Sequence, residues 1–173
     1  MDSMAFSTGG MVMKIRNATA GDMKLLGHIM AVSFRSAFCE FVSQQTLDAC
    51  AQEENCAMLL EGVFHQGNMH FLVGEDSGML VWQPAEDGAE IVAIHSLPES
   101  WGSGLGHAMI EKAMEQIGDV SVSLWAFEDN RRARRFYEKH GFCWDGSRRI
   151  SKFDGAAEVR YVLRRCEPHG SCK

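Results

Sequence analysis

The hydrophobic and polar positions of this 173-residue chain predict a domain that contains both helices and strands. Residues 11–17 have β-like character, and apolar residues recur at three- and four-residue spacing from Met23 onward, as on the buried face of a helix. Thr19, with an acidic residue three positions later at Asp22, is typical of the N-cap that begins such a helix. Residues 43–61 repeat the helical spacing. The chain is therefore expected to open with one strand and two helices.

Three β-rich runs follow, at residues 70–75, 79–83 and 90–97. Asp76-Ser77-Gly78 gives a hairpin signal between the first two runs, and residues 84–88 give the second turn. Short turns of this kind join antiparallel neighbours. We therefore expect three consecutive antiparallel strands.

A helical pattern begins after Gly104 and ends at Gly118, and it leads into another β-rich run at residues 120–127. Because a helix crosses between them, this run and residues 90–97 are expected to form parallel strands of one mixed sheet. The remaining expected elements are a short helix and two closing strands, at residues 131–140, 142–144 and 158–163.

Composition and charge narrow the class of protein. The length fits one domain, expected at residues 11–165, with residues 1–10 a disordered extension and residues 166–173 a loose tail. The formal net charge of −6 argues against a general nucleic-acid binder. An acidic protein suits cationic substrates, although mild acidity also favours solubility.

The chain has no apolar run long enough to span a membrane and no secretory signal, so we expect a cytoplasmic protein. In that compartment its cysteines are expected to be free thiols: Cys39, Cys50, Cys56, Cys143, Cys166 and Cys172. Cys166, His169 and Cys172 lie close together, but three soft ligands without a fourth are weak grounds for zinc, and no metal is expected.

Residues 89–106 carry the strongest chemical signal. A β-rich run passes through Pro98 into a loop with Gly102, Gly104 and Gly106 at alternate positions, and a helix follows at once. Glycines let the backbone approach a ligand closely, and the first helical turn leaves several N–H groups without partners inside the helix. These groups, with the positive end of the helix dipole, favour a pyrophosphate. The spacing is neither G-x-G-x-x-G nor that of a P-loop.

Residues 123–142, SLWAFEDNRRARRFYEKHGF, add a second motif. Together with the glycine loop, this segment resembles the GCN5-related N-acetyltransferase superfamily. The loop at residues 101–106 is similar to the family's Arg/Gln-x-x-Gly-x-Gly/Ala sequence, except that Trp101 stands where the family has Arg or Gln. The second motif reads N-x-x-A-x-x-F-Y-x-x-x-G-F and comprises Asn130, Ala133, Phe136, Tyr137, Gly141 and Phe142.

The resemblance implies a mixed, mostly antiparallel α/β sheet of about six to seven strands with about four helices on both faces. It also implies that acetyl-CoA is the cosubstrate, bound between two splayed parallel strands. The residues implied to bind it are Ile94, Ser96, Leu97, Gly102, Ser103, Gly104, Leu105, Gly106 and Asn130. An equal alternative for Asn130 is that it caps the following helix. One arginine of the RRARR run is a further candidate for the 3′-phosphate, although such a run is usually the solvated side of a helix.

Acetyl transfer needs a base, a polarised thioester carbonyl and a proton for the leaving thiolate. The resemblance assigns the proton to Tyr137, whose alternative is a core aromatic residue, and the polarised carbonyl to a backbone N–H near a strand bulge. Glu90 is the favoured base, with His95 or water as alternatives. The resemblance implies that Phe34, Phe38 and Glu40 contact the substrate. The favoured alternative for the phenylalanines is that they pack two helices together.

The expected function is transfer of an acetyl group from acetyl-CoA to a primary amine of a small molecule. Two alternatives remain: a protein N-terminus or lysine as the acceptor, and a non-catalytic acyl-CoA-binding module. The expected partners are acetyl-CoA and the amine, without nucleic acid or membrane, in a monomer or homodimer.

Overall fold

The computed structural model describes residues 5–8, 11–39, 42–151 and 155–164. Its strands run in the order β1-β2-β3-β4-β5-β6-β8-β7. Their bounds are β1 Ala5–Thr8, β2 Met11–Asn17, β3 His70–Gly74, β4 Gly78–Ala85, β5 Gly88–Ser96, β6 Val122–Phe127, β7 Cys143–Ile150 and β8 Ala157–Leu163. The helices are α1 Met23–Phe38, α2 Gln44–Cys50, α3 Glu53–Gln66, α4 Leu105–Ile117 and α5 Arg131–Lys139, with the 3-10 turns η1 Ala20–Asp22 and η2 Pro98–Ser100.

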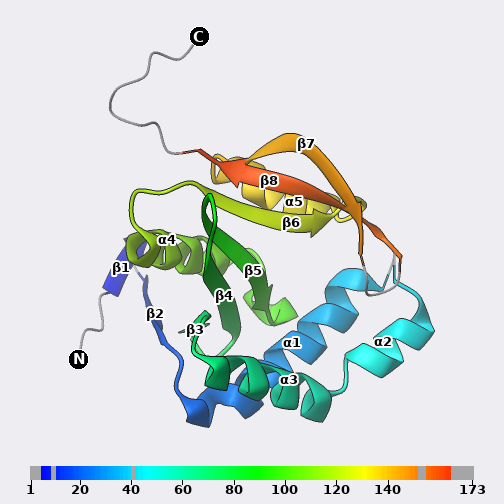
Figure 1. Cartoon of the computed structure of the whole chain (residues 1–173). Coiled ribbons are helices and arrows are strands. Elements are labelled where there is room, and N and C mark those ends of the chain that lie inside the picture. The colour runs from blue at the N-terminus through cyan, green and yellow to red at the C-terminus, as the bar shows by residue number, and fades with distance from the viewer. Residues whose placement is uncertain (1–4, 9–10, 40–41, 152–154, 165–173) are drawn as a thin grey trace, which may run out of the picture.

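Helices cover both faces of the sheet (Figure 1). One core cluster joins α4 and Tyr137 of α5 to one face, and a second joins α1 and Leu60 of α3 to the other. On β3 and β4 the side chains alternate between these clusters, because successive residues of a strand point to opposite faces: Leu72 and Leu80 pack on the α4 side, whereas Phe71 and Val81 pack on the α1 side. The predicted mixed α/β fold is confirmed.

β5 contains a bulge that divides it into two halves. Val81 of β4 pairs with Ala93, whereas Trp82 pairs with Ile91, so Val92 is an extra residue. The bulge reverses the alternation: Ala89 and Ile91 belong to the α4-side core before it, but Ala93 packs on the α1 side after it.

β5 and β6 are parallel, as predicted, but they pair over three positions only. The pairs are Ala89 with Val122, Glu90 with Ser123 and Ile91 with Leu124. Beyond them β5 pairs only with β4, and β6 continues only along β8, among the residues that the structure describes. The two strands are thus splayed from the bulge at Val92 onward.

The predicted helix at residues 43–61 is wrong as a single element. The structure has two helices there, α2 and α3, with a break at Ala51 and Gln52. At this break Gln52 has extended backbone, with ψ of 126°, and Arg35 of α1 donates from its Nε and Nη2 to the carbonyl of Ala51 at 3.1 and 2.9 Å. Met58 and Leu59, two apolar positions of the helical pattern at residues 43–61, are 67% and 53% exposed.

The N-terminal segment contains the predicted helix cap at Thr19 and an additional strand. Thr19 and Asp22 form the expected capping interaction, with the Thr19 N–H donating to the Asp22 carboxylate at 2.7 Å, and Arg16 also binds that carboxylate. Ala5–Thr8, part of the segment expected to be disordered, forms β1 against β2. Backbone hydrogen bonds to the edge of β2 stabilise this strand. The Ser- and Gly-rich composition of the segment gave no sign of this pairing.

Candidate active site

The glycine loop enters α4 with the geometry that an anion site requires. Gly102 and Gly104 have φ of 81° and 92°, in the left-handed region that favours glycine. The first hydrogen bond of α4 runs from Ala108 N–H to the Gly104 carbonyl at 3.0 Å, so the N–H groups of the first helical turn have no acceptor within the helix. Ser103 Oγ accepts one of them, from Leu105, at 3.3 Å. The others point outward at the positive end of the helix dipole.

α5 packs against the start of α4. A Cβ added to Gly106 would lie 3.0 Å from the Phe136 ring, so glycine permits this close approach. Asn130 Oδ1 accepts from the Ala133 N–H at 3.0 Å, which establishes its capping geometry and occupies its carbonyl oxygen. The second motif thus fixes α5 beside the glycine loop.

The Tyr137 ring is buried against Phe136, Phe142 and Tyr161. Burial raises the pKa of this tyrosine, so its phenol remains protonated. No hydrogen-bond partner of its hydroxyl exists among the described residues, and these residues include no fully buried side-chain oxygen that lacks a partner. The hydroxyl therefore retains access to solvent or ligand, although the ring packs in the α4-side core.

The opposite face of the splayed strands carries the two candidate bases. Glu90 lies between the α4-facing residues Ala89 and Ile91, so it points to the α1 side, where Gln83 Nε2 donates to its carboxylate at 2.9 Å. His95 points to the same face, and its Nδ1 lies 2.6 Å from the Ser33 hydroxyl of α1. Burial lowers the pKa of His95 to about 4, so the ring is neutral near pH 7 although its side chain keeps some surface exposure.

Aromatic rings close one end of this face. Phe38 lies with its ring centroid 4.5 Å from Phe34 and 5.1 Å from Phe127 at the end of β6. Phe34 also packs with Leu47 of α2, so it does join the helices as the alternative interpretation proposed. Phe38 bridges that small core and the splayed strands.

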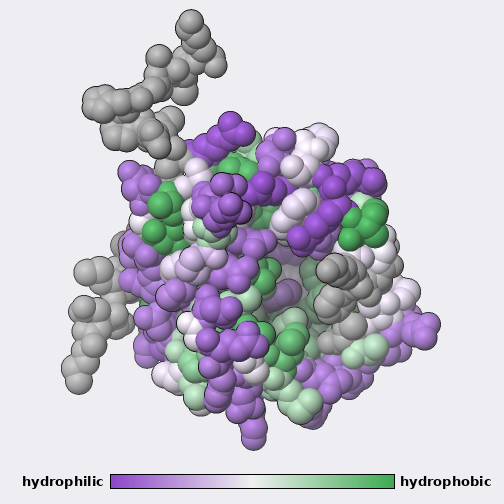
Figure 2. All heavy atoms as spheres, viewed as in Figure 1, coloured by the Kyte–Doolittle hydropathy of each residue, from purple (hydrophilic) through white to green (hydrophobic). Residues whose placement is uncertain are grey.

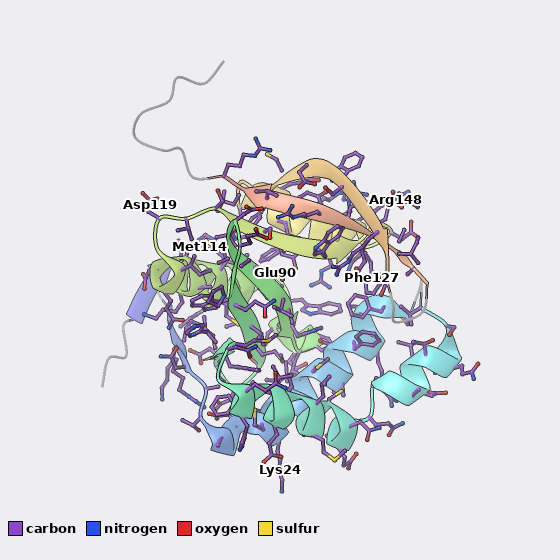
Figure 3. The ribbon with its side chains drawn as sticks, viewed as in Figure 1. Lys24, Glu90, Met114, Asp119, Phe127 and Arg148 are labelled. Atoms are coloured by element: carbon purple, nitrogen blue, oxygen red, sulfur yellow. The ribbon has the colours of Figure 1, made fainter. Side chains whose placement is uncertain are left out.

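A hollow of about 520 Å³ borders the paired half of β5 and β6 on the same face. Glu90 and Trp125 lie in its wall, together with Glu86, Asp87, Asp145 and Arg160. Figure 2 shows that this face is hollowed near its centre, with hydrophilic residues above the hollow and hydrophobic residues below it. In Figure 3, Glu90 lies near the middle of the same view, and Phe127 lies toward the end of α1.

The structure brings most predicted site residues to these two faces. Ser96 and Leu97 lie at the end of β5, where the Ser96 carbonyl accepts from Trp101 Nε1 at 3.1 Å, and Ile94 packs on the α4 side. Glu40, Cys166, His169 and Cys172 lie outside the described residues. Within the described part of the chain, Cys39, Cys56 and Cys143 are free thiols, and no group of three His, Cys, Asp or Glu residues could hold a metal.

Three side chains at the site were not predicted. Ser33, Trp125 and Phe127 line the α1-side face through contacts between elements. The parallel pairing of residues 120–127 with the glycine-loop strand was the available signal for Trp125 and Phe127, whereas Ser33 had none. No helix in the described ranges is both long and apolar enough to cross a bilayer.

Comparison with known proteins identifies the family to which this site belongs. Residues 26–142 match the model of the acetyltransferase (GNAT) family. A probable N-acetyltransferase of Mycobacterium tuberculosis is 32% identical over 76 residues, 42% of this chain and 44% of that protein, so the match spans less than half the relative's length.

Solved structures support the fold. The PaiA N-acetyltransferase of Thermoplasma acidophilum, crystallised with coenzyme A, superposes with a TM-score of 0.72 at 19% identity, covering 89% of this chain and 99% of that one. Mutant forms of the spermidine/spermine N-acetyltransferase of Vibrio cholerae give a TM-score of 0.64 at 17% identity, covering 88% and 94%. The family model spans more than half of the chain and includes both motifs, so this protein belongs to the acetyltransferase (GNAT) family.

Proposed function

We propose that the protein transfers the acetyl group of acetyl-CoA to a primary amine of a small molecule. One observation carries the proposal: β5 and β6 separate after three pairs, with the glycine loop at the start of α4 on one side and Glu90 and His95 on the other. A thioester lying between the strands would then be approached by the amine from the α1 side.

The residues on the α4 side fit acetyl-CoA. Gly102 and Gly104 allow the loop to approach a phosphate, and the first turn of α4 offers free N–H groups to it. Beyond Ile91, the unpaired edges of β5 and β6 offer backbone groups to the amides of a pantetheine arm. Acetyl-CoA supplies the activated acetyl group, and the protein supplies orientation and proton transfer.

In the proposed reaction the neutral amine nitrogen attacks the thioester carbonyl carbon. A carbon–nitrogen bond forms, the carbon–sulfur bond breaks, and the electron pair leaves with sulfur as a thiolate. A backbone N–H beside the bulge at Val92 would stabilise the oxyanion that forms meanwhile. Tyr137 donates its proton to the thiolate, for which its protonated, unpartnered hydroxyl is suited.

The proton lost by the amine goes to Glu90, directly or through water. Glu90 borders the open hollow and its only described partner is the neutral amide of Gln83. His95 is the weaker candidate, because its Nδ1 is engaged by the Ser33 hydroxyl at 2.6 Å, whereas Glu90 borders the hollow.

The test is an acetyl-CoA assay of the purified protein against a panel of amines, read by release of free thiol and by mass spectrometry of the acceptor. We expect turnover on at least one small primary amine, with the acceptor gaining one acetyl group. Turnover confined to protein N-termini or lysines would replace the small-molecule acceptor. Binding of acetyl-CoA without turnover on any acceptor would favour a non-catalytic acyl-CoA-binding module.

A further inference from the structure

The glycine loop lacks a side-chain cation of its own. Trp101 stands at the first position of the loop, and its Nε1, the only donor of an indole, is used by the Ser96 carbonyl at 3.1 Å. The Ser103 hydroxyl donates to the Ser100 carbonyl at 2.7 Å. A phosphate at this loop would therefore meet backbone N–H groups but no positive charge from residues 101–106.

A cation from another helix lies on this loop. The Cζ of Arg132, in the first turn of α5, is 3.5 Å from the centroid of the Trp101 ring. Arg132 is one helical turn before Phe136, whose ring packs against Gly106, so the same face of α5 that contacts α4 also carries Arg132 over the loop. Stacking uses the face of the guanidinium group, and its N–H groups stay directed outward along the edge.

The charge of Arg132 is not neutralised by a described residue. Arg16, Arg148, Arg149 and Arg160 each pair with a carboxylate, and Arg134 donates to the Tyr161 hydroxyl and the Glu128 carbonyl. Arg132 has no carboxylate partner among the described residues. It is also partly desolvated against the indole, which lowers its pKa. An uncompensated, partly desolvated guanidinium beside a helix N-terminus is arranged for an anion.

We propose that Arg132, held in place by Trp101, supplies the positive charge that binds a phosphate of acetyl-CoA at this loop. The proposal rests on the proposed binding of acetyl-CoA and names its phosphate ligand. The hydrogen bond from Trp101 to the Ser96 carbonyl holds the indole in place, and the Arg132 guanidinium stacks on that indole. The charge therefore comes from α5 rather than from the loop.

Calorimetric titration with coenzyme A tests the proposal without requiring catalysis. Arg132→Gln should weaken binding roughly ten- to a hundredfold, the usual loss for a charge-assisted hydrogen bond. Arg132 and Arg135 are both exposed, but only Arg132 lies over Trp101 among the described residues. Arg135→Gln is therefore the matched control, because it removes the same charge from the same helix and should leave affinity within twofold. Equal affinities of the two variants would overturn the proposal.

A rescue variant tests whether the lost affinity comes from the missing positive charge or from a disturbed fold. In the Arg132→Gln background, Trp101→Arg places a cation in the loop itself and should restore most of the lost affinity. Trp101→Leu alone should weaken binding several-fold, because Arg132 loses its platform. Thermal unfolding of each variant checks that it is folded. A folded double variant as weak as Arg132→Gln alone would contradict the assignment of the charge to this loop.

Dephospho-CoA distinguishes the two phosphate sources. If Arg132 binds the pyrophosphate, Arg132→Gln should lose the same factor on coenzyme A and dephospho-CoA. If it binds the 3′-phosphate, the loss should disappear with dephospho-CoA. Either result supports a phosphate ligand. Failure of the wild-type protein to bind coenzyme A would overturn the proposed function and this proposal together, whereas wild-type binding with an unaffected Arg132→Gln variant would overturn only the assignment of Arg132.

Discussion

Two buried tyrosines with different hydroxyl environments allow the proposed acid to be tested at a single residue. Tyr137→Phe keeps the ring contacts and removes a hydroxyl that has no described partner, so the variant should fold and bind coenzyme A normally. If the hydroxyl protonates the thiolate, kcat should fall by about 10²- to 10⁴-fold. Steady-state kinetics with saturating acetyl-CoA measures this fall.

Tyr161→Phe is the control for that experiment. The Tyr161 hydroxyl donates to Glu138 at 2.8 Å and accepts from Arg134 at 3.0 Å, so its removal should lower the free energy of unfolding by about 1–2 kcal/mol and leave kcat unchanged. A Tyr137→Phe enzyme that turns over within twofold of the wild type would remove Tyr137 from the mechanism and leave water as the proton source.

Residue types and their local spacing were readable in the sequence, but contacts between elements were not. The absence of the loop cation at Trp101 was visible in the sequence itself. One arginine of the RRARR run was a candidate for a phosphate ligand, but its contact with Trp101 was not visible, because Arg132 lies 31 residues away and reaches the loop through the packing of Phe136 on Gly106. The bond between Ser33 and His95 likewise joins α1 to β5 and leaves no local pattern.

At the scale of elements, the connection from β5 through the loop to α4 depends on backbone freedom at Gly104. A Cβ there would have space, since the nearest atom is Met13 Cε at 3.7 Å, but φ of 92° is unfavourable for other residues. Gly104→Ala should therefore lower the free energy of unfolding by about 1–3 kcal/mol and weaken coenzyme A binding at least severalfold. Chemical denaturation and calorimetry measure the two effects.

Gly62→Ala is the matched control for the glycine. Gly62 lies in α3 with open space around an added Cβ and no positive φ, so alanine should raise the free energy of unfolding by about 0.5–1 kcal/mol and leave binding unchanged. A Gly104→Ala protein with wild-type affinity would place the phosphate away from this loop.

The order and type of most elements followed from periodicity and turn residues. The antiparallel run β3-β4-β5, the crossover helix α4 and the parallel β6 were all predicted. The bulge was expected only from the family resemblance, and its position at Val92 was not readable, because the apolar run that contains it reads as one continuous strand. The break between α2 and α3 was missed because Ala51 and Gln52 include neither glycine nor proline, and Arg35 binds the Ala51 carbonyl from another helix.

At the scale of the whole molecule, part of the net negative charge of −6 is concentrated beside the proposed acceptor site. The hollow beside Glu90 is lined by four carboxylates, from Glu86, Asp87, Glu90 and Asp145, and by the guanidinium groups of Arg160 and Arg164. Arg160 lies 3.5 Å from Asp145, so that pair is largely self-compensated. The remaining excess of negative charge faces the side from which the acceptor is proposed to arrive.

A cationic acceptor should therefore be attracted to this face before it reacts. For the best amine of the panel, raising NaCl from low ionic strength to about 0.5 M should increase the KM for the amine, because salt screens exposed charges beyond a few ångströms.

Asp87→Asn should raise the KM for the amine about two- to fivefold with kcat unchanged, as for one exposed ion pair. Glu61→Gln makes the same change in net charge on α3, away from the hollow, and should have no effect. Equal KM values for both variants, or turnover restricted to neutral or anionic acceptors, would show that the acidic hollow does not select the substrate.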